Sequence, residues 1–304
     1  MTNVNVAAHD YAVEKWSPKI TAYLINTGAY VDIVNRDYEG EIKNSGDKVI
    51  FFSKKGLTVR DYNPNATGFE EIQVENPTGT KMELEINQQK YQAFEIEDID
   101  RVQANVNLVN EWTQTIAYSF SDEKDKFINS LAITGAGTKL HNDSPLNLTK
   151  DNIWAEVCTL FVKLAENKAL TKEGLDYSGK RPALVVSPAV EGILLQTAQF
   201  FTNPFGDQVL RKGQIGRIGM FDVFRDTLIT TDKSGTGTSA VYSQKMVALT
   251  SQAITYAEQI TKTETYRSQK SFKDVVRALM TYGGTVADAR CIVTDRVTFS
   301  GLGA

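Results

Sequence analysis

Four carboxylates fall within six residues in the stretch EIEDID, residues 95–100, a density that could bind a cation or supply a general acid and base. The stretch follows the strand-like QKYQAF, so Glu95 and Glu97 are expected on the same, solvated face of a strand. Asp98 and Asp100 come where a helix-like run begins, and carboxylates there accept hydrogen bonds from free N–H groups. We predict that Asp98 and Asp100 cap a helix, with a metal or catalytic role as the alternative.

The other reactive residue types form no motif with an established chemistry. The two histidines, His9 and His141, lack the HExxH spacing and a neighbouring cysteine, so a zinc site is not predicted. A Ser-His-Asp triad assembles only in the fold and stays open, although no GxSxG motif is present. The glycines of GQIGRIGMF match neither common phosphate-binding pattern and indicate turns. The sequence therefore names no catalytic, metal or cofactor-binding residue, and no cofactor.

The composition is that of an ordinary folded chain with one large domain or two modest ones. The 304 residues are 41% hydrophobic and 23% charged, with a net charge of -4 that gives no overall drive towards nucleic acid or an anionic membrane. Cys158 and Cys291 are far apart in the sequence, which suits a reducing compartment, and both are expected to be buried apolar fillers. No signal-peptide pattern or membrane-spanning apolar run is present, so we expect synthesis in the cytoplasm.

The first third of the chain predicts an arm followed by strands. Residues 1–37 combine two short apolar pieces and read as an arm rather than a core element. Period-two alternation then predicts strands at 47–53, 56–62, 70–76 and 80–97, joined through Asn-Pro turns. The resulting hairpin has little core of its own, and two-stranded ribbons are marginally stable in water.

A long helix is predicted from Ile99 to Ile133. Its apolar residues keep spacings of three, four or seven, as one helical stripe requires. At 1.5 Å per residue the helix would be about 50 Å long, close to the diameter of a compact chain of this size. A break at Ser119–Ser121 is the alternative.

Beyond a polar loop near residues 135–145, the pattern changes to an α/β block. Asp151 or Thr149 is expected to cap a helix, PALVVS reads as a buried strand, and Ser187 and Pro188 open another helix. Residues 216–229 and 239–251 read as strands, and the final segment as strands that pair back with earlier parts of the chain.

Several segments, taken in order, resemble the HK97-fold major capsid proteins of tailed bacteriophages. These segments are YAVEKWSPKITAYL, NRDYEGEIKNSGDKVIFF, GLTVRDYNP, QQKYQAFEIEDIDRVQAN, PALVVSPAVEGILL, GRIGMFDVF and AITYAEQITKTETYRSQKSFKDVVRALMTYGG. The resemblance implies an α+β, HK97-like capsid fold. It implies an N-terminal arm at 1–39, an extended β-hairpin (the E-loop) region at 40–97, a peripheral domain with a long spine helix at 98–144, an axial α/β domain at 145–257 and a return to the peripheral domain at 258–304.

The resemblance also implies a function. The chain would be a structural protein and not an enzyme, a major capsid (head) protein that self-assembles into pentamers and hexamers around phage double-stranded DNA, without sequence-specific binding and without a membrane. Its implied partners are the portal and a scaffolding protein. Because arm-like sequence starts at once, scaffolding is expected from a separate chain, with no need for scaffolding as the alternative. The implied location is the virion, with assembly in the host cytoplasm. The alternatives are an encapsulin-type nanocompartment shell and a soluble α+β enzyme.

Overall fold

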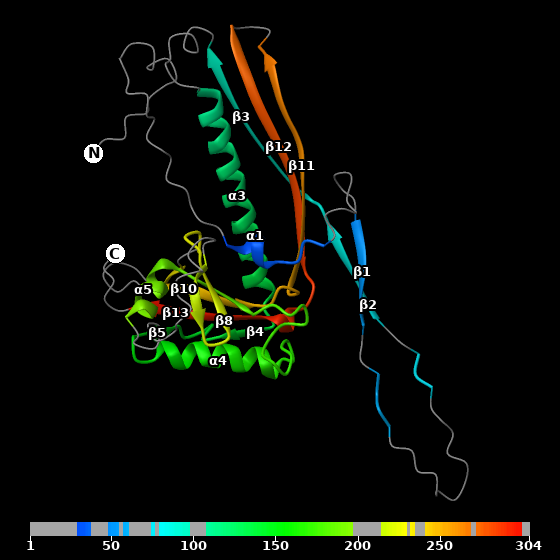
Figure 1. Ribbon diagram of the computed structural model, residues 1–304, viewed down its shortest axis with the longest axis vertical. Coiled ribbons are helices and arrows are strands. Elements are labelled where there is room, and N and C mark those ends of the chain that lie inside the picture. The colour runs from blue at the N-terminus through cyan, green and yellow to red at the C-terminus, as the bar shows by residue number, and fades with distance from the viewer. Residues whose placement is uncertain are drawn as a thin grey trace, which may run out of the picture.

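The computed structural model describes residues 29–37, 48–54, 57–60, 74–76, 79–97, 108–196, 214–229, 232–234, 241–268 and 272–299. Their strands form three separate sheets of two, eight and three strands, combined with helices, so the predicted α+β class is confirmed. Figure 1 shows a compact block at one end, a long helix lying along the three-stranded sheet, and a two-stranded element that extends away from both. Among the described residues, no helix has the length and apolar character that a membrane span requires.

The two-stranded sheet consists of β1 (Lys48–Lys54) and β2 (Gly79–Glu85), which pair antiparallel with Lys54 opposite Gly79. We call β1, β2 and the segments 57–60 and 74–76 the projecting ribbon (Figure 1). The predicted strands at 56–62 and 70–76 are wrong for the described segments, which carry no strand. There the two sides are joined through the Glu75 side chain, which accepts from the Thr58 N–H at 3.1 Å. With no second layer beneath it, the backbone ladder does not continue.

The three-stranded sheet has the order β11 (Ile254–Arg267), β12 (Lys273–Val286), β3 (Gln88–Glu97). The predicted strand at 80–97 is thus two strands in different sheets, because β2 pairs with β1 and β3 pairs with β12. The return of the final segment to earlier strands is confirmed by the β12–β3 pairing.

Helix α3 (Leu108–Gly135) packs along this sheet, with the ring of Phe127 edge-on to that of Tyr282 at 5.2 Å between centroids. The 28 residues rise about 42 Å. The helix is continuous through Ser119, whose hydroxyl donates to the Thr115 carbonyl at 3.0 Å instead of capping a new helix. The predicted start near Ile99 lies outside the described residues.

The eight-stranded sheet forms the compact block and has the order β4-β13-β10-β6-β8-β7, with β5 paired to β13 and β9 to β10. Its strands are β4 (Thr138–Leu140), β5 (Leu146–Leu148), β6 (Ala183–Val186), β7 (Gln214–Ile218), β8 (Phe221–Arg225), β9 (Asp232–Ser234), β10 (Val241–Leu249) and β13 (Ile292–Phe299). All four residues of β6 are buried, as its apolar run predicts. The turn between β7 and β8 contains Gly219 at φ +57°, so this glycine serves a turn as expected.

Two helices and a short 3-10 turn, η4 (Ala289–Cys291), complete the block. Helix α5 (Pro188–Leu195) begins as predicted, with Ser187 Oγ accepting from the Val190 N–H at 3.4 Å. Helix α4 (Ile153–Glu166) has Asn152 as its N-cap residue, so the predicted caps Asp151 and Thr149 are wrong. The Asn152 side chain turns back and accepts from the Thr149 N–H at 2.8 Å, which closes the preceding turn.

The prediction that the first segment lies outside the core is wrong for residues 29–37, which we call the arm segment. Its helix α1 (Tyr30–Ile33) buries Tyr30 and Ile33 in the main hydrophobic core. Of the two cysteines expected to be buried, Cys291 is buried but Cys158 is exposed, because it lies on the outer face of α4. In each case the residues that pack against the segment are distant in sequence, so local hydrophobic periodicity does not reveal whether its side chains are buried.

Candidate functional site

The most unusual surface of the molecule is the projecting ribbon. Val59 is 96% exposed and Val74 is 90% exposed, and Leu57 and Ile50 also present apolar side chains to solvent. The described part of the ribbon carries few contacts with the body beyond its base. Apolar side chains on a two-stranded element of this kind need another surface to cover them.

The base of the ribbon is firmly seated on the body. Val49, Leu84 and Ile86 are buried together with Ala257 of β11, and Phe51 packs against them. Gly283 of β12 lies directly beneath the end of β2, where an added Cβ would meet the Glu85 carbonyl oxygen at 2.2 Å. Only a glycine permits this close backbone approach, so the body fixes where the ribbon leaves it.

A second candidate surface is a shallow groove on the outer face of the three-stranded sheet. Tyr282 and Met280 point towards α3 and are buried, so by alternation Leu279 and Arg277 point the other way. The groove has a volume of about 500 Å³, and we call it the sheet groove; it is lined by Tyr91, Ala93, Glu264, Tyr266, Arg277, Ala278 and Leu279. Tyr91 is 81% exposed, so the sheet groove presents an aromatic side chain ready for contact.

The described half of the acidic stretch, residues 95–97, is the solvated end of strand β3. Glu95 and Glu97 alternate with the buried Ile96 on β3, as predicted. Lys273 of the paired strand β12 contacts both, with Nζ at 2.7 Å from Glu95 Oε1 and 3.1 Å from Glu97 Oε1. The hydrogen bond to Glu95 is the main reason that the pKa of Lys273 is raised. Asp98 and Asp100 lie outside the described residues, so their capping role stays a prediction.

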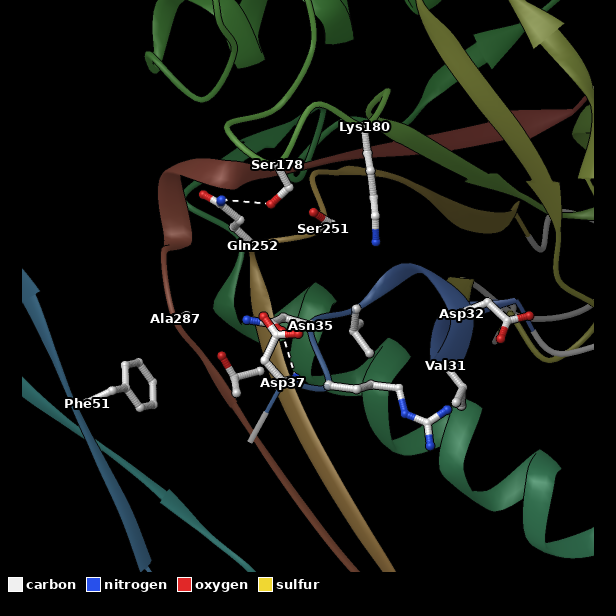
Figure 2. Close-up of a pocket in the computed structure, with 13 residues that line it drawn as sticks. Val31, Asp32, Asn35, Asp37, Phe51, Ser178, Lys180, Ser251, Gln252 and Ala287 are labelled. Atoms are coloured by element: carbon white, nitrogen blue, oxygen red, sulfur yellow. Dashed lines mark hydrogen bonds between the residues drawn. The ribbon is translucent and has the colours of Figure 1, made fainter. Parts of the chain in front are cut away.

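A polar pocket of about 450 Å³ opens where the arm segment, the compact block and the ribbon base meet. Figure 2 shows Lys180 and Ser178 from the block facing Asn35 and Asp37 of the arm segment, with Phe51 at one side. Gln252 Nε2 donates to Ser178 Oγ at 2.9 Å along the edge of the pocket that the compact block forms. The residues that line the pocket in the described part of the chain include no histidine or cysteine. The hydroxyl of Ser251 and its backbone N–H both donate to Asp176 Oδ2, so this carboxylate fixes the Ser251 side chain in place.

The arm segment is tied to α3 by a buried carboxylate. Asp125 Oδ1 accepts from the backbone N–H of Tyr30 at 3.0 Å and of Val31 at 3.3 Å. The Tyr30 hydroxyl donates to Asn129 Oδ1, one turn further along α3, at 3.1 Å. Burial raises the pKa of Asp125 to about 6, against the two N–H donors, which favour its charged form.

The structure also gathers three side chains that the sequence analysis did not connect. His141, Glu156 and Asp295 offer ligand atoms that all lie within 4.8 Å of one another. His141 Nδ1 is 2.8 Å from Asp295 Oδ1 and 3.8 Å from Glu156 Oε1. Burial raises the pKa of Asp295 and of Glu156, and the neighbouring charge of Asp295 raises that of Glu156 further. The sequence predicts no zinc site at His141, and local spacing gives no signal of this cluster, since Asp295 is 154 positions away.

Comparisons with known proteins agree on one class. A family model described as phage capsid protein matches residues 81–294, more than half of the chain. The solved structure of Mycobacterium phage Che8 aligns with a TM-score of 0.72 and 23% identity over 100% of both chains. The capsid of cyanophage P-SCSP1u aligns with a TM-score of 0.70 and 11% identity over 99% of this chain and 97% of that one. The capsid of Ralstonia phage GP4 aligns at 0.64 and 13% over 100% of both. No curated protein sequence matches the chain.

Proposed function

This chain belongs to the phage capsid protein family and is a major capsid protein of an icosahedral head, and we propose that it builds the shell as pentamers and hexamers around double-stranded DNA. The observation that carries the mode of assembly is the projecting ribbon with its exposed Val59 and Val74. In a closed shell, a neighbouring subunit covers this apolar surface, which one chain alone leaves in water. The sheet groove, with its exposed Tyr91, is the surface on the body best suited to receive such an element.

We propose the division of the chain that the resemblance implied. Residues 1–39 form the arm, 40–97 the E-loop region, 98–144 the peripheral domain with its spine helix, 145–257 the axial domain and 258–304 the return to the peripheral domain. Strand β3, although within the E-loop region, pairs with β12 and joins the ribbon to the peripheral sheet. Asp98 and Asp100 are proposed as caps at the start of the spine helix, where their charge would suit its dipole.

The proposed partners follow from the same role. Further copies of this chain form the shell, a portal occupies one vertex, and a separate scaffolding protein directs assembly in the host cytoplasm. The net charge of -4 supports a shell that contains DNA without holding it by many phosphate contacts, because such contacts would add a strong, salt-dependent affinity. We propose no catalytic activity and no membrane partner for this chain.

Shortening the ribbon tests its role directly. Lys54 and Gly79 are opposite each other at the end of the β1–β2 ladder, so residues 55–78 can be replaced by the two-residue turn Asn-Gly. The shortened chain is expected to keep the far-ultraviolet circular dichroism and unfolding midpoint of the parent subunit. It should form no closed particles by negative-stain electron microscopy, while the parent, expressed in parallel, does. Shells of normal size and yield from the shortened chain would refute the ribbon's role.

The contents of the particles separate the proposal from its alternatives. A phage head isolated after infection protects double-stranded DNA from nuclease. An encapsulin-type shell would contain a cargo enzyme instead. If the chain were a soluble enzyme that used the acidic stretch, the double variant Asp98→Asn with Asp100→Asn would abolish a measurable turnover. If these residues cap a helix, the same variant should lose little stability, because asparagine is itself a good N-cap residue.

A further inference from the structure

Three ligand-bearing side chains converge from three separate elements of the compact block. His141 follows β4, Glu156 lies in the first turn of α4, and Asp295 lies in β13. Their imidazole nitrogen and carboxylate oxygens lie within 4.8 Å of one another, so small side-chain rotations would bring them to the roughly 3–4 Å that separates atoms bound to one small ion. This cluster is remote in the fold from the projecting ribbon and from the sheet groove, and the assembly proposal does not use it.

Two oxygen atoms of the cluster are buried without a hydrogen-bond partner. Glu156 Oε1 and Asp295 Oδ2 have none, and the Asp295 side chain is 0% exposed. Arg296, the nearest cation along the chain, does not compensate them, because its guanidinium donates to Ser243 Oγ and to the Asn142 carbonyl. Two buried carboxylates therefore face a single imidazole, an arrangement that is costly unless another positive charge joins it.

We propose that His141, Glu156 and Asp295 bind one divalent first-row transition-metal ion, of which Zn²⁺ is the probe of choice. One imidazole nitrogen with two carboxylates is a ligand set that such ions accept, whereas Ca²⁺ and Mg²⁺ take oxygen ligands throughout. The His141 side chain is 36% exposed, so an ion has access from solvent and water can complete its coordination. Asp295 and Glu156 would gain a partner for the oxygens that now lack one.

Such an ion would act as a structural clamp on the compact block. It would join the loop after β4 to the start of α4 and to β13, and so add a link from α4 to two strands that already pair with each other. The backbone of His141 has φ +48°, a left-handed conformation that residues other than glycine rarely adopt. A bond from its imidazole to a metal ion would help to stabilise this backbone conformation. An ion that binds only the folded block stabilises it in proportion to the logarithm of ion concentration over Kd.

The test is metal titration of the full chain without an affinity tag. Cys158, an exposed thiol two positions from Glu156, is first replaced by serine so that thiol binding does not confuse the result. After chelation and dialysis, isothermal titration with ZnCl₂ is expected to show one ion per chain. Co²⁺ should give visible absorption bands of a protein site, and Zn²⁺ should raise the unfolding temperature.

The decisive variant is His141→Asn, because asparagine tolerates positive φ and leaves the two buried carboxylates in place. Affinity for Zn²⁺ should fall roughly tenfold or more, and the rise in unfolding temperature should disappear. His9→Asn, at the other histidine of the chain, is the matched control and should bind like the parent. Absence of stoichiometric binding, or equal affinity in His141→Asn, would overturn the proposal. A carboxylic-acid infrared band at neutral pH that Glu156→Gln removes, and that persists when ZnCl₂ is added, would overturn it in favour of a shared proton.

Discussion

The backbone N–H of Tyr30 donates to Asp125 Oδ1 at 3.0 Å, across 95 positions of sequence, and so joins the arm segment to α3. The backbone N–H of Val31 donates to the same oxygen, so Asp125 Oδ1 accepts hydrogen bonds from two backbone N–H groups at the start of α1. A helix of four residues cannot stabilise itself, so its place depends on this carboxylate and on the burial of Tyr30.

Replacing Asp125 separates its acceptor role from its charge. Asp125→Ala removes the partner of two N–H groups and should lower the free energy of unfolding by about 2 kcal/mol or more. Asp125→Asn keeps an acceptor oxygen and should cost clearly less at neutral pH. Urea unfolding of the unassembled subunit, followed by circular dichroism, gives both values. Equal losses in the two variants would contradict the acceptor role.

The same pair predicts a pH dependence. The pKa of Asp125 is raised from its ordinary 3.8 to about 6, mainly by burial and also by the charges of Asp226 and Asp32. The folded state therefore binds more protons than the unfolded state between these values. The contribution of Asp125 to stability falls as pH rises through this window, by at most about 3 kcal/mol. The parent should lose stability relative to Asp125→Asn between pH 4 and pH 7.5, and parallel pH profiles would contradict the shift.

Gly283 is predicted to be irreplaceable at the ribbon base. A Cβ there would lie 2.2 Å from the Glu85 carbonyl oxygen and 2.8 Å from the Ile86 Cα, so backbone must move. Gly283→Ala should lower the free energy of unfolding by about 1–3 kcal/mol and reduce the yield of closed shells. Gly192→Ala is the control, since nothing lies within 4 Å of its added Cβ and alanine favours the helix. Similar behaviour of the two variants in thermal unfolding would show that the ribbon base tolerates displacement.

The exposed valines of the ribbon should matter only for assembly. Val59→Ser with Val74→Ser should change the stability of the isolated subunit by less than about 0.5 kcal/mol, because both side chains are already in water. Particle yield by electron microscopy and by sedimentation should nevertheless drop. Val59→Ile with Val74→Ile keeps the apolar surface and should assemble normally. Unchanged yield from the serine variant would mean that neighbouring subunits do not cover these positions.

The carboxylates of β3 are expected to contribute little. Lys273 with Glu95 and Glu97 is a solvent-exposed group of charges, and water screens such pairs so that they contribute little to stability. Glu95→Gln with Glu97→Gln should therefore assemble normally, with a small stability loss that salt diminishes. A larger loss, or loss of assembly, would point to a partner for these carboxylates outside the chain.

The strands and helices that could be predicted from the sequence share one property: each buries one of its faces against a neighbouring element along its length. The alternation around Ile96 and the helical stripe that includes Phe127 record such burial directly in the sequence. Ser187 and Pro188 marked the start of α5 because capping is a local interaction. The order of segments in the capsid family then supplied the topology, which periodicity alone does not contain.

The parts that were missed depend on partners far away in the chain. Tyr30 reads as part of an arm until Asp125 and Asn129 are placed beside it. His141 carries no motif, because its neighbours Glu156 and Asp295 arrive on a helix and a strand from other regions. The strand expected at 56–62 has the alternation of a strand but no layer to lie on, so its described residues do not continue the ladder.

Strand β13 (residues 292–299) lies between β4 and β10 in the largest sheet and also pairs with β5. A chain without these residues would leave β4 and β5 without their pairing partner and one backbone edge of β10 unpaired. Loss of this one strand would therefore open the largest sheet, and we expect such a chain to be unable to enter a particle.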